Sequence, residues 1–476
     1  MKQHSFWTAL CLLFVAASAT GQTMKSSMEF APSEHWIKPV EKPYREEICL
    51  NGTWAFAPVQ LPAGFKEGET AAPALPGVNE VTFSKTPIRI PSPWNVNSFA
   101  DKNGLGGDHR TYPSYPKEWE SIKMGWLQKK FTVPASWKGK RIQIHFEAVA
   151  GKTDVYVNGK IVGNNFDIFM PFDVDITDVV KFGQENVLNV GILKSSLFDD
   201  RKSPLGRRTY QGGSFWGQHI AGIWQDVYLV ALPQTRVADV YIQPIVNKNT
   251  LEVEVTLRND ENKAVEVSLS AAAYPWISKA GKTTLTAANP SSQLGTQAAL
   301  QIPVQKITIP AGKEIKTTLK TTVDNKLKLW SPSSPNLYGL VVKTAVNGKT
   351  NDSKYTRFGW RQTELKDGQF WLNGEPFVLK GDSWHFMGIP QMTRRYAWAW
   401  YTALRAANCN AVRFHAQPYP TFYLDVADEM GMLVLDESAM WASDGGQKLG
   451  SEEFWKCSEE HMKQLVLRDR NHPSVF

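Results

Sequence analysis

The first half of the chain alternates between apolar and polar residues with a period of two. Between residues 45 and 233, runs such as Arg141-Ile142-Gln143-Ile144-His145-Phe146 are separated by turn residues. Because successive side chains of a strand point to opposite faces, this pattern predicts half-buried antiparallel sheet. His145 and Glu147 alternate with apolar positions and are therefore predicted to face solvent. We expect a jelly-roll β-sandwich at residues 23–233.

A second all-β unit is predicted at residues 234–358. The run Leu251-Glu252-Val253-Glu254-Val255-Thr256-Leu257 alternates strictly, and similar runs recur at the spacing of an immunoglobulin-like β-sandwich. Residues 283–301 are rich in Ala, Thr, Ser and Gln, so we expect a long surface loop there.

The pattern changes after about residue 357 to short apolar strands that alternate with helices of period 3.6. The expected elements are strands at 377–381, 410–414 and 432–435, and helices at 397–407, at 422–430 before Gly431, and after an N-cap at Ser451. Three such units predict a parallel sheet. Residues 359–476 number 118, whereas a closed (β/α)8 barrel needs about 250. We therefore expect an incomplete TIM barrel.

The last residues, 470–476, read as a helix end that runs into the first residues of a buried strand. An open arc of barrel strands would expose apolar edges, which favours aggregation. The sequence is thus expected to be either a fragment of a longer protein or a product that folds poorly beyond about residue 360.

The N-terminus has the pattern of a secretory signal peptide, which we place at residues 1–22. Lys2 precedes an apolar run that ends in the small residues Ala17-Ser18-Ala19. No later segment offers the ~18 uninterrupted apolar residues of a membrane-spanning helix. We expect an exported protein, periplasmic or extracellular, without a permanent membrane span.

Cysteine usage fits export without dependence on disulfides. Cys11 leaves with the signal peptide, and Cys49, Cys409 and Cys457 allow at most one bridge. These three are expected to be buried small apolar side chains. No Cys/His cluster has zinc spacing, so the spacing gives no sign of a zinc site.

The formal net charge of +7 raises the question of a polyanionic partner. The basic residues occur in pairs, such as Lys129-Lys130, Arg207-Arg208 and Arg394-Arg395, and not in dense runs. A solvated surface is the favoured interpretation, and no nucleic-acid partner is expected.

Short motifs from about residue 45 to the last residue follow the order of one known family. The chain resembles glycoside hydrolase family 2, the β-galactosidase, β-glucuronidase and β-mannosidase group. The motifs that carry the resemblance are Leu50-Asn51-Gly52-Thr53-Trp54, Val155-Tyr156-Val157-Asn158-Gly159-Lys160 and Gly222-Ile223-Trp224-Gln225-Asp226-Val227 in the first domain, Leu329-Trp330-Ser331-Pro332 and Arg357-Phe358-Gly359-Trp360-Arg361 in the second, and Leu372-Asn373-Gly374, Asn410-Ala411-Val412-Arg413, Asp428-Glu429-Met430-Gly431, Asp436-Glu437 and Arg470-Asn471-His472-Pro473-Ser474 in the third.

The resemblance implies a retaining β-glycosidase that removes terminal β-linked sugars from an oligosaccharide or glycoside and needs no cofactor. Retention requires two carboxyl groups about 5 to 5.5 Å apart. In the resembled family the acid/base Glu follows the Arg-Asn-His-Pro-Ser motif and the nucleophile Glu lies farther on. Both positions fall beyond Phe476, so this chain by itself is predicted to be inactive.

The remaining site residues are expected at the C-terminal ends of the first three barrel strands, where barrel active sites are built. Arg413 can hold a catalytic carboxylate ionised, or form a structural ion pair. His385 stands where the family often has a sugar-contacting histidine, although a loop histidine satisfied by its neighbours is an alternative. Trp384 and Trp441 can form a wall for a sugar ring, or pack in the core.

Asp436 and Glu437 are consecutive, so their side chains point to opposite faces and cannot flank one bond. Glu437 is expected to bind substrate or position its neighbours, and Asp436 to play a structural role. The chain also departs from the family pattern. It has His415-Ala416-Gln417-Pro418 where many members have Ser-His-Tyr-Pro, and after Glu437 it lacks the magnesium-binding residues of some β-galactosidases, so no metal is predicted.

A rival hypothesis is a secreted carbohydrate-binding or adhesion protein in which the two sandwiches carry the function. It predicts glycan binding by residues 23–233 alone. A scaffold without glycan affinity is a third possibility.

Overall fold

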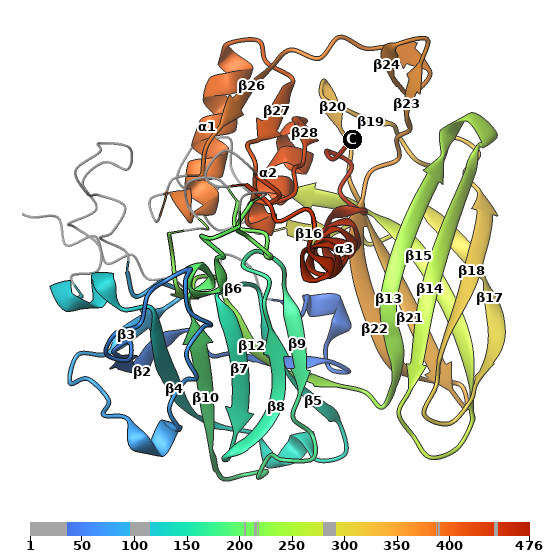
Figure 1. Ribbon diagram of the computed structural model, residues 1–476. Coiled ribbons are helices and arrows are strands. Elements are labelled where there is room, and N and C mark those ends of the chain that lie inside the picture. The colour runs from blue at the N-terminus through green and yellow to red at the C-terminus, as the bar shows by residue number, and fades with distance from the viewer. Residues whose placement is uncertain are drawn as a thin grey trace, which may run out of the picture.

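The structure is a computed structural model that describes residues 36–95, 115–203, 206–213, 217, 219–278, 292–386, 388, 391–441 and 446–476. The predicted signal peptide and the side chain of Trp384 lie outside the described residues. Figure 1 shows two β-sandwiches beside each other, with strands and helices of the C-terminal part above them and α3 at the junction. This is the predicted order of a jelly roll, an immunoglobulin-like sandwich and a partial βα barrel.

The jelly roll consists of two facing sheets and a short ribbon of β6 (Val149–Ala150) with β11 (Gly222–Ile223). The four-stranded sheet has the order β1 (Glu46–Cys49), β12 (Val227–Leu232), β5 (Arg141–Phe146) and β9 (Phe172–Asp175). The six-stranded sheet has the order β3 (Ile88–Ile90), β2 (Gly52–Val59), β4 (Met124–Thr132), β10 (Glu185–Leu193), β7 (Lys152–Val157) and β8 (Lys160–Asn165). Apolar residues of both sheets fill the space between them.

His145 on β5 contradicts the prediction that it faces solvent, because it is only 2% exposed. The indole of Trp36 stacks on its ring at a centroid distance of 3.9 Å, so the N-terminal segment covers this side of the sheet. The imidazole lies between two carboxylates, 2.8 Å from Asp173 and 3.4 Å from Glu147. The alternation of apolar and polar residues predicted correctly that His145 lies on the outer face of the strand. It did not predict that Trp36 covers this face.

The second sandwich pairs β13 (Thr235–Ile245), β14 (Thr250–Asn259) and β18 (Glu314–Thr322) in one sheet. The other sheet contains β16 (Ser292–Leu294), β15 (Val265–Ser278), β21 (Tyr338–Val346), β22 (Lys349–Phe358) and β17 (Leu300–Ile309), which also pairs with β15. β16 and the start of β17 fall within residues 283–301, so the prediction of a continuous loop is wrong for the part of that stretch that the structure describes.

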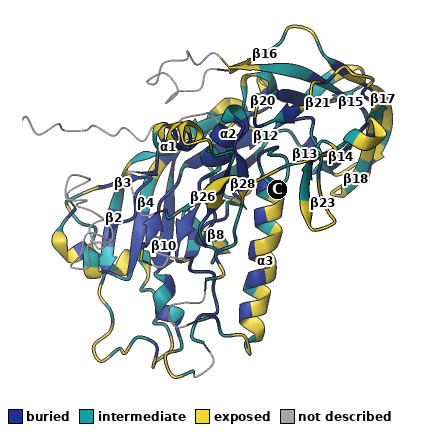
Figure 2. Ribbon diagram, turned by 90° about the horizontal axis from the view of Figure 1, so that it is seen from above, coloured by how far each residue is buried: buried dark blue, intermediate teal, exposed yellow. Residues whose placement is uncertain are grey.

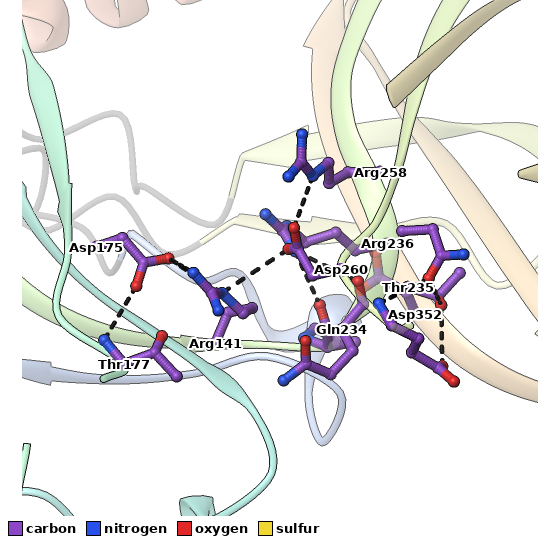
Figure 3. Close-up of polar contacts among 12 residues, drawn as sticks. Arg141, Asp175, Thr177, Gln234, Thr235, Arg236, Arg258, Asp260 and Asp352 are labelled. Carbon is purple, nitrogen blue, oxygen red and sulfur yellow. Dashed lines mark hydrogen bonds and ion pairs between the residues drawn. The ribbon is translucent and has the colours of Figure 1, made fainter. Parts of the chain in front are cut away.

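Charged side chains join the two sandwiches. Arg45 donates to both carboxylate oxygens of Asp352 at 2.8 and 2.7 Å, and both side chains are buried. Figure 3 shows a second group, in which Arg141 of the jelly roll lies 3.9 Å from Asp260 of the second sandwich. Asp260 also pairs with Arg236 and Arg258. Burial alone would raise the pKa of the Asp260 carboxyl, but these two guanidinium groups lower it.

The third part is a parallel sheet of β26 (Gly381–Trp384), β27 (Ala411–Phe414) and β28 (Leu433–Leu435), with the helices α1 (Arg394–Ala406), α2 (Thr421–Met430) and α3 (Glu452–Asp469). The predicted N-cap is present, since Ser451 Oγ accepts from the Phe454 amide. After α3, Val475 forms a parallel bridge with Val434 on β28, as expected for the next strand of the sheet.

The first of these strands lies later than predicted. The apolar run at 377–381 favoured a strand there, but β26 begins only at Gly381. The Asn410 side chain donates to the Val378 carbonyl at 2.9 Å and accepts from the Lys380 amide at 2.8 Å. An amide side chain thus takes the place of a neighbouring strand for these residues.

A short hairpin of β19 (Trp330–Ser331) with β20 (Ser334–Pro335) precedes β21 in the second sandwich. Between β22 and β26, the chain forms a three-stranded sheet of β23 (Thr363–Lys366), β24 (Gln369–Leu372) and β25 (Glu375–Pro376). The first hairpin packs on the end of α2, where Gly431 adopts a left-handed φ of 71°. A Cβ on Gly431 would lie 2.5 Å from the Pro332 carbonyl oxygen. Arg405 of α1 donates to the same oxygen at 3.1 Å.

Asp428 on α2 connects these parts. One carboxylate oxygen accepts from His472 Nδ1 at 2.7 Å and the other from the Ser474 amide at 3.0 Å. Arg357 Nη2 lies 3.1 Å from the same carboxylate, and the Asp428 carbonyl accepts from the Trp330 indole.

The three described cysteines are free. Cys49 is exposed at the end of β1, and Cys409 and Cys457 are half-buried, so the expectation of buried cysteines is wrong. Among the helices of the described residues, none has the length and apolarity to cross a bilayer.

The environment of His145 predicts a pH dependence. Burial alone would lower the pKa of the imidazole, but Asp173 and Glu147 raise it from 6.5 to about 10. Because the folded-state pKa is raised, the stabilisation is complete below about pH 6.5 and is lost as the pH rises through 10. We expect the unfolding free energy to fall more steeply from pH 7 to 10 in the wild type than in His145→Gln, by at most about 1.4 kcal/mol per pH unit. Urea unfolding monitored by tryptophan fluorescence measures both slopes, and equal slopes would contradict the assignment.

Candidate active site

Polar side chains gather at the C-terminal ends of the three parallel strands. The register aligns Ser383 of β26 with Arg413 of β27, and Arg413 with Leu435 of β28. His385 follows β26, and Glu437 follows β28 by two residues. Because the strands are parallel, these residues reach the same edge of the sheet.

Arg413 and Glu437 form a bidentate ion pair. Arg413 Nη2 donates to Glu437 Oε2 at 3.0 Å, and Nε contacts Oε1. The Ala416 amide donates to Oε2 at 2.7 Å, and Ala416 has a left-handed φ of 54°. The Arg413 side chain is 44% exposed and that of Glu437 is 21% exposed. The pair is therefore open to solvent on one side and fixes the Glu437 carboxylate in position.

His385 and His415 stand beside this pair. Their ring centroids are 3.9 Å apart with an interplanar angle of 46°. Burial, the neighbouring His415 and Arg413 all lower the pKa of His385. A neutral imidazole has one donor and one acceptor nitrogen, so His385 can exchange hydrogen bonds with a hydroxyl group.

Asp436 turns away from this cluster, as predicted. Burial and the neighbouring carboxylate of Asp469 on α3 raise its pKa well above the usual range, while Arg468 acts in the opposite direction. Asp436 and Glu437 thus have different surroundings, since Glu437 binds Arg413 and Asp436 lies against α3. They are not a pair of carboxyl groups that can flank one glycosidic bond.

Trp441 lies on the loop after β28 and is half-buried. Its carbonyl accepts from Gln447 Nε2 at 2.9 Å. The side chain of Trp384, the other predicted wall of the site, lies outside the described residues. Both tryptophans therefore remain predictions.

The jelly roll holds the loop that carries these residues, an interaction that the sequence did not reveal. The Ala439 amide donates to His461 Nε2 at 3.1 Å, and the Ala439 carbonyl accepts from the Gly213 amide at 3.0 Å. His461 Nδ1 lies 2.6 Å from Asp167 of the jelly roll. Because Nε2 accepts, Nδ1 carries the proton and donates to Asp167. Asp167 and His461 are 294 positions apart, and neither belongs to a motif that would mark it.

A second acidic cluster is spaced suitably for a metal ion. Ligand atoms of Asp425, Asp428 and His472 lie within 4.8 Å of one another. Arg357 forms ion pairs with both carboxylates and with Glu429. This guanidinium supplies the positive charge that a cation would bring, so we interpret the cluster as an ion-pair network.

The fold and the strand-end cluster define a modular protein in which two β-sandwiches precede a partial βα barrel with its polar site at the carboxyl edge. Sequence profiles of one family match all three parts: "Glycosyl hydrolases family 2, sugar binding domain" at residues 48–233, "Glycosyl hydrolases family 2" at 235–361, and "Glycosyl hydrolases family 2, TIM barrel domain" at 363–476. The chain belongs to glycoside hydrolase family 2.

Curated relatives include a β-galactosidase of Thermoanaerobacter pseudethanolicus, 29% identical over 375 residues, which make up 77% of this chain and 46% of the relative. A β-glucuronidase of Formosa agariphila is 26% identical over 425 residues, or 84% of this chain and 39% of the relative. The chain therefore spans less than half of either protein.

Solved structures share the fold. A family 2 member from Bacteroides cellulosilyticus superposes with a TM-score of 0.63 at 23% identity and covers 90% of this chain and 52% of its own. A β-galacturonidase from Eisenbergiella tayi bound to galacturonate has a TM-score of 0.67 at 17% identity and covers 91% of this chain and 65% of its own.

The site geometry predicts that only one of two neighbouring carboxylates protects the Ala416 amide from hydrogen exchange. Glu437→Ala removes the acceptor of the Ala416 amide, so this amide should exchange its hydrogen roughly tenfold faster. Asp436→Asn is the matched control, because it changes the neighbouring carboxyl, which lies against Asp469 of α3, and should leave the exchange of the Ala416 amide unchanged. Hydrogen-deuterium exchange with mass spectrometry measures both. Faster exchange in both variants, or in neither, would contradict the geometry.

Proposed function

We propose that the protein is an exported β-glycosidase that releases terminal β-linked sugars with retention of configuration. The arrangement that carries this proposal is the Arg413–Glu437 pair with His385 at the carboxyl edge of the parallel sheet. Membership of glycoside hydrolase family 2 supports it, as do the β-galactosidase and β-glucuronidase names of the relatives. The sugar that it releases is not part of the proposal.

In this proposal the described strand ends form the substrate-binding side of the site. Glu437 pairs with Arg413 and accepts a hydrogen bond from the Ala416 amide, which fixes its carboxylate where it can also accept hydrogen bonds from sugar hydroxyl groups. His385 can donate to or accept from a further hydroxyl. Trp441 can cover an apolar face of the ring.

We further propose that the acid/base and the nucleophile come from segments outside residues 1–476. Retaining hydrolysis needs two carboxyl groups about 5 to 5.5 Å apart. At the described strand ends, Glu437 pairs with Arg413 and Asp436 lies against Asp469 on the other side. Neither arrangement supplies a protonated acid opposite an ionised nucleophile across a shared space.

Hydrolysis assays test where the two catalytic carboxyl groups lie. Residues 1–476 should not hydrolyse 4-nitrophenyl β-galactoside, β-glucuronide or β-mannoside above background, whereas the product of the complete reading frame should hydrolyse one of them. An open frame that encodes Asn-Glu soon after Phe476 would support the enzyme. Turnover by residues 1–476 would refute the placement of the catalytic pair. A complete product that binds glycans but hydrolyses none would favour the alternative of a carbohydrate-binding or adhesion protein.

Export is proposed on the N-terminal pattern alone, a charged Lys2 followed by a short apolar run and Ala17-Ser18-Ala19. The mature protein should be recovered outside the cytoplasm with its N-terminus close to residue 23. N-terminal sequencing of the periplasmic and secreted fractions tests this, and an intact Met1 on the protein of these fractions would contradict it.

A further inference from the structure

Strand register brings three lysines together at one end of the six-stranded sheet. Leu193, the last residue of β10, pairs with Met124 at the start of β4 and with Lys152 at the start of β7. Lys123 and Lys194 are the next residues beyond that pairing, and the Lys194 amide donates to the Lys123 carbonyl at 2.7 Å. Figure 1 shows β4, β10 and β7 as neighbours. Lys123, Lys152 and Lys194 thus lie at the same end of the sheet, a rim to which three neighbouring strands each contribute a lysine.

Few carboxylates form ion pairs with the basic side chains of this rim. Lys123 pairs with Glu67, and Arg201 lies 3.7 Å from the same carboxylate. In the part of the chain that the structure describes, Lys152 and Lys194 take part in no ion pair, and Lys152 instead stands 5.4 Å from the centre of the Phe198 ring. Within the described residues, the carboxylate of Glu67 is thus the only ion-pair partner of the four cations Lys123, Lys152, Lys194 and Arg201.

The other carboxylate that acts on Lys194, that of Asp199, already has partners of its own. Asp199 accepts from the Tyr210 hydroxyl at 2.8 Å and lies 3.4 Å from Arg207 Nε. Burial and the neighbouring Lys123 lower the pKa of Lys194 to about 8, although Glu67 and Asp199 act in the opposite direction. The Lys194 ammonium thus has one like charge near it, Lys123, and forms no ion pair within the described residues, so a bound anion would stabilise its charged form.

The rim lies on the side of the jelly roll that meets the barrel. From Lys194 the chain continues through η6 (Ser195–Phe198) to Asp200, which pairs with Lys448 at 2.5 Å. It then reaches Gly213, whose amide binds the Ala439 carbonyl two residues after Glu437. Two contacts of the described residues, at Asp200 and at Gly213, therefore join the chain that follows the rim to the part of the barrel that carries the candidate active site.

We propose that Lys123, Lys152, Lys194 and Arg201 form a binding site for an anionic unit of a glycan, a sugar that carries a carboxylate or sulfate group. This rests on the proposed function only in taking a glycan as the ligand, because binding needs no turnover. Such a site would select glycans with charged units beside the terminal sugar. The ammonium group of a lysine is a flexible point charge that can bind an anionic group in several orientations. We therefore expect the rim to select ligands by their negative charge and not by one fixed binding geometry.

Direct binding tests the proposal on residues 1–476 and on the complete product. Isothermal titration calorimetry compares oligogalacturonides, sulfated dextran oligosaccharides and neutral dextran oligosaccharides, which separate carboxylate from sulfate and both from neutral sugar. The double variant Lys152→Gln/Arg201→Gln should bind the preferred anionic ligand about tenfold more weakly, since each lost charge contact is worth up to about 1 kcal/mol. Lys316→Gln/Lys320→Gln is the matched control, because it removes two exposed lysines from β18 of the other sandwich.

A second measurement does not depend on the folding of any variant. In the wild type, the bound anionic oligosaccharide should slow acetylation of Lys194, detected by mass spectrometry, because an anion raises the pKa of the amine and shields it. Equal binding of neutral dextran, equal loss in the control variant, unprotected Lys194, or tighter binding of duplex DNA than of either anionic glycan would each overturn the proposal. Failure of hydrolysis alone would leave these binding results unaffected.

Discussion

The buried carboxylate of Asp428 is the interaction on which the C-terminal part of the structure depends. It is 1% exposed and has three partners from two parts of the structure: Arg357 of the second sandwich, and His472 and Ser474 of the segment after α3. A carboxylate is removed from water only at high cost, which these charged and backbone donors offset. Since Asp428 ties that segment to the second sandwich, it helps to fix where Val475 meets β28, and hence the direction of the sheet edge that carries the site.

The candidate site is held together by interactions within the barrel and by contacts from the jelly roll. Glu437 takes its position from Arg413 and from the Ala416 amide, but the loop beyond it is held by His461 and Gly213. His461 in turn is oriented by Asp167 of the jelly roll. The jelly roll is therefore a structural support for the barrel loop as well as a separate domain. This explains why a partial sheet can present an ordered set of side chains at its carboxyl edge.

Periodicity and capping were sufficient to predict most of the fold. The helical face of α1 and the Gly431 stop of α2 are local signals, and the structure confirms both. The errors came from distant contacts. The run at 377–381 is apolar enough for a strand, but the Asn410 side chain binds its backbone. His145 is polar and alternates correctly, but Trp36 covers it. Arg413 and Glu437 were predicted from their strand-end positions and His385 from the family resemblance. No local pattern marks Asp167 or His461, because a bond across 294 positions leaves no local trace.

Gly431 has a consequence for how such a protein can diversify. The residue ends α2 and also leaves room for the Pro332 carbonyl, which Arg405 binds from α1. Any side chain there would have to displace backbone of the preceding sandwich while also straining its own conformation. The second sandwich and the barrel helices are thus matched at a contact that neither can change alone. When genes of this family recombine, we expect the second sandwich and the barrel helices to be exchanged as one unit. An exchange that replaces only one side of the contact should give a poorly folded protein.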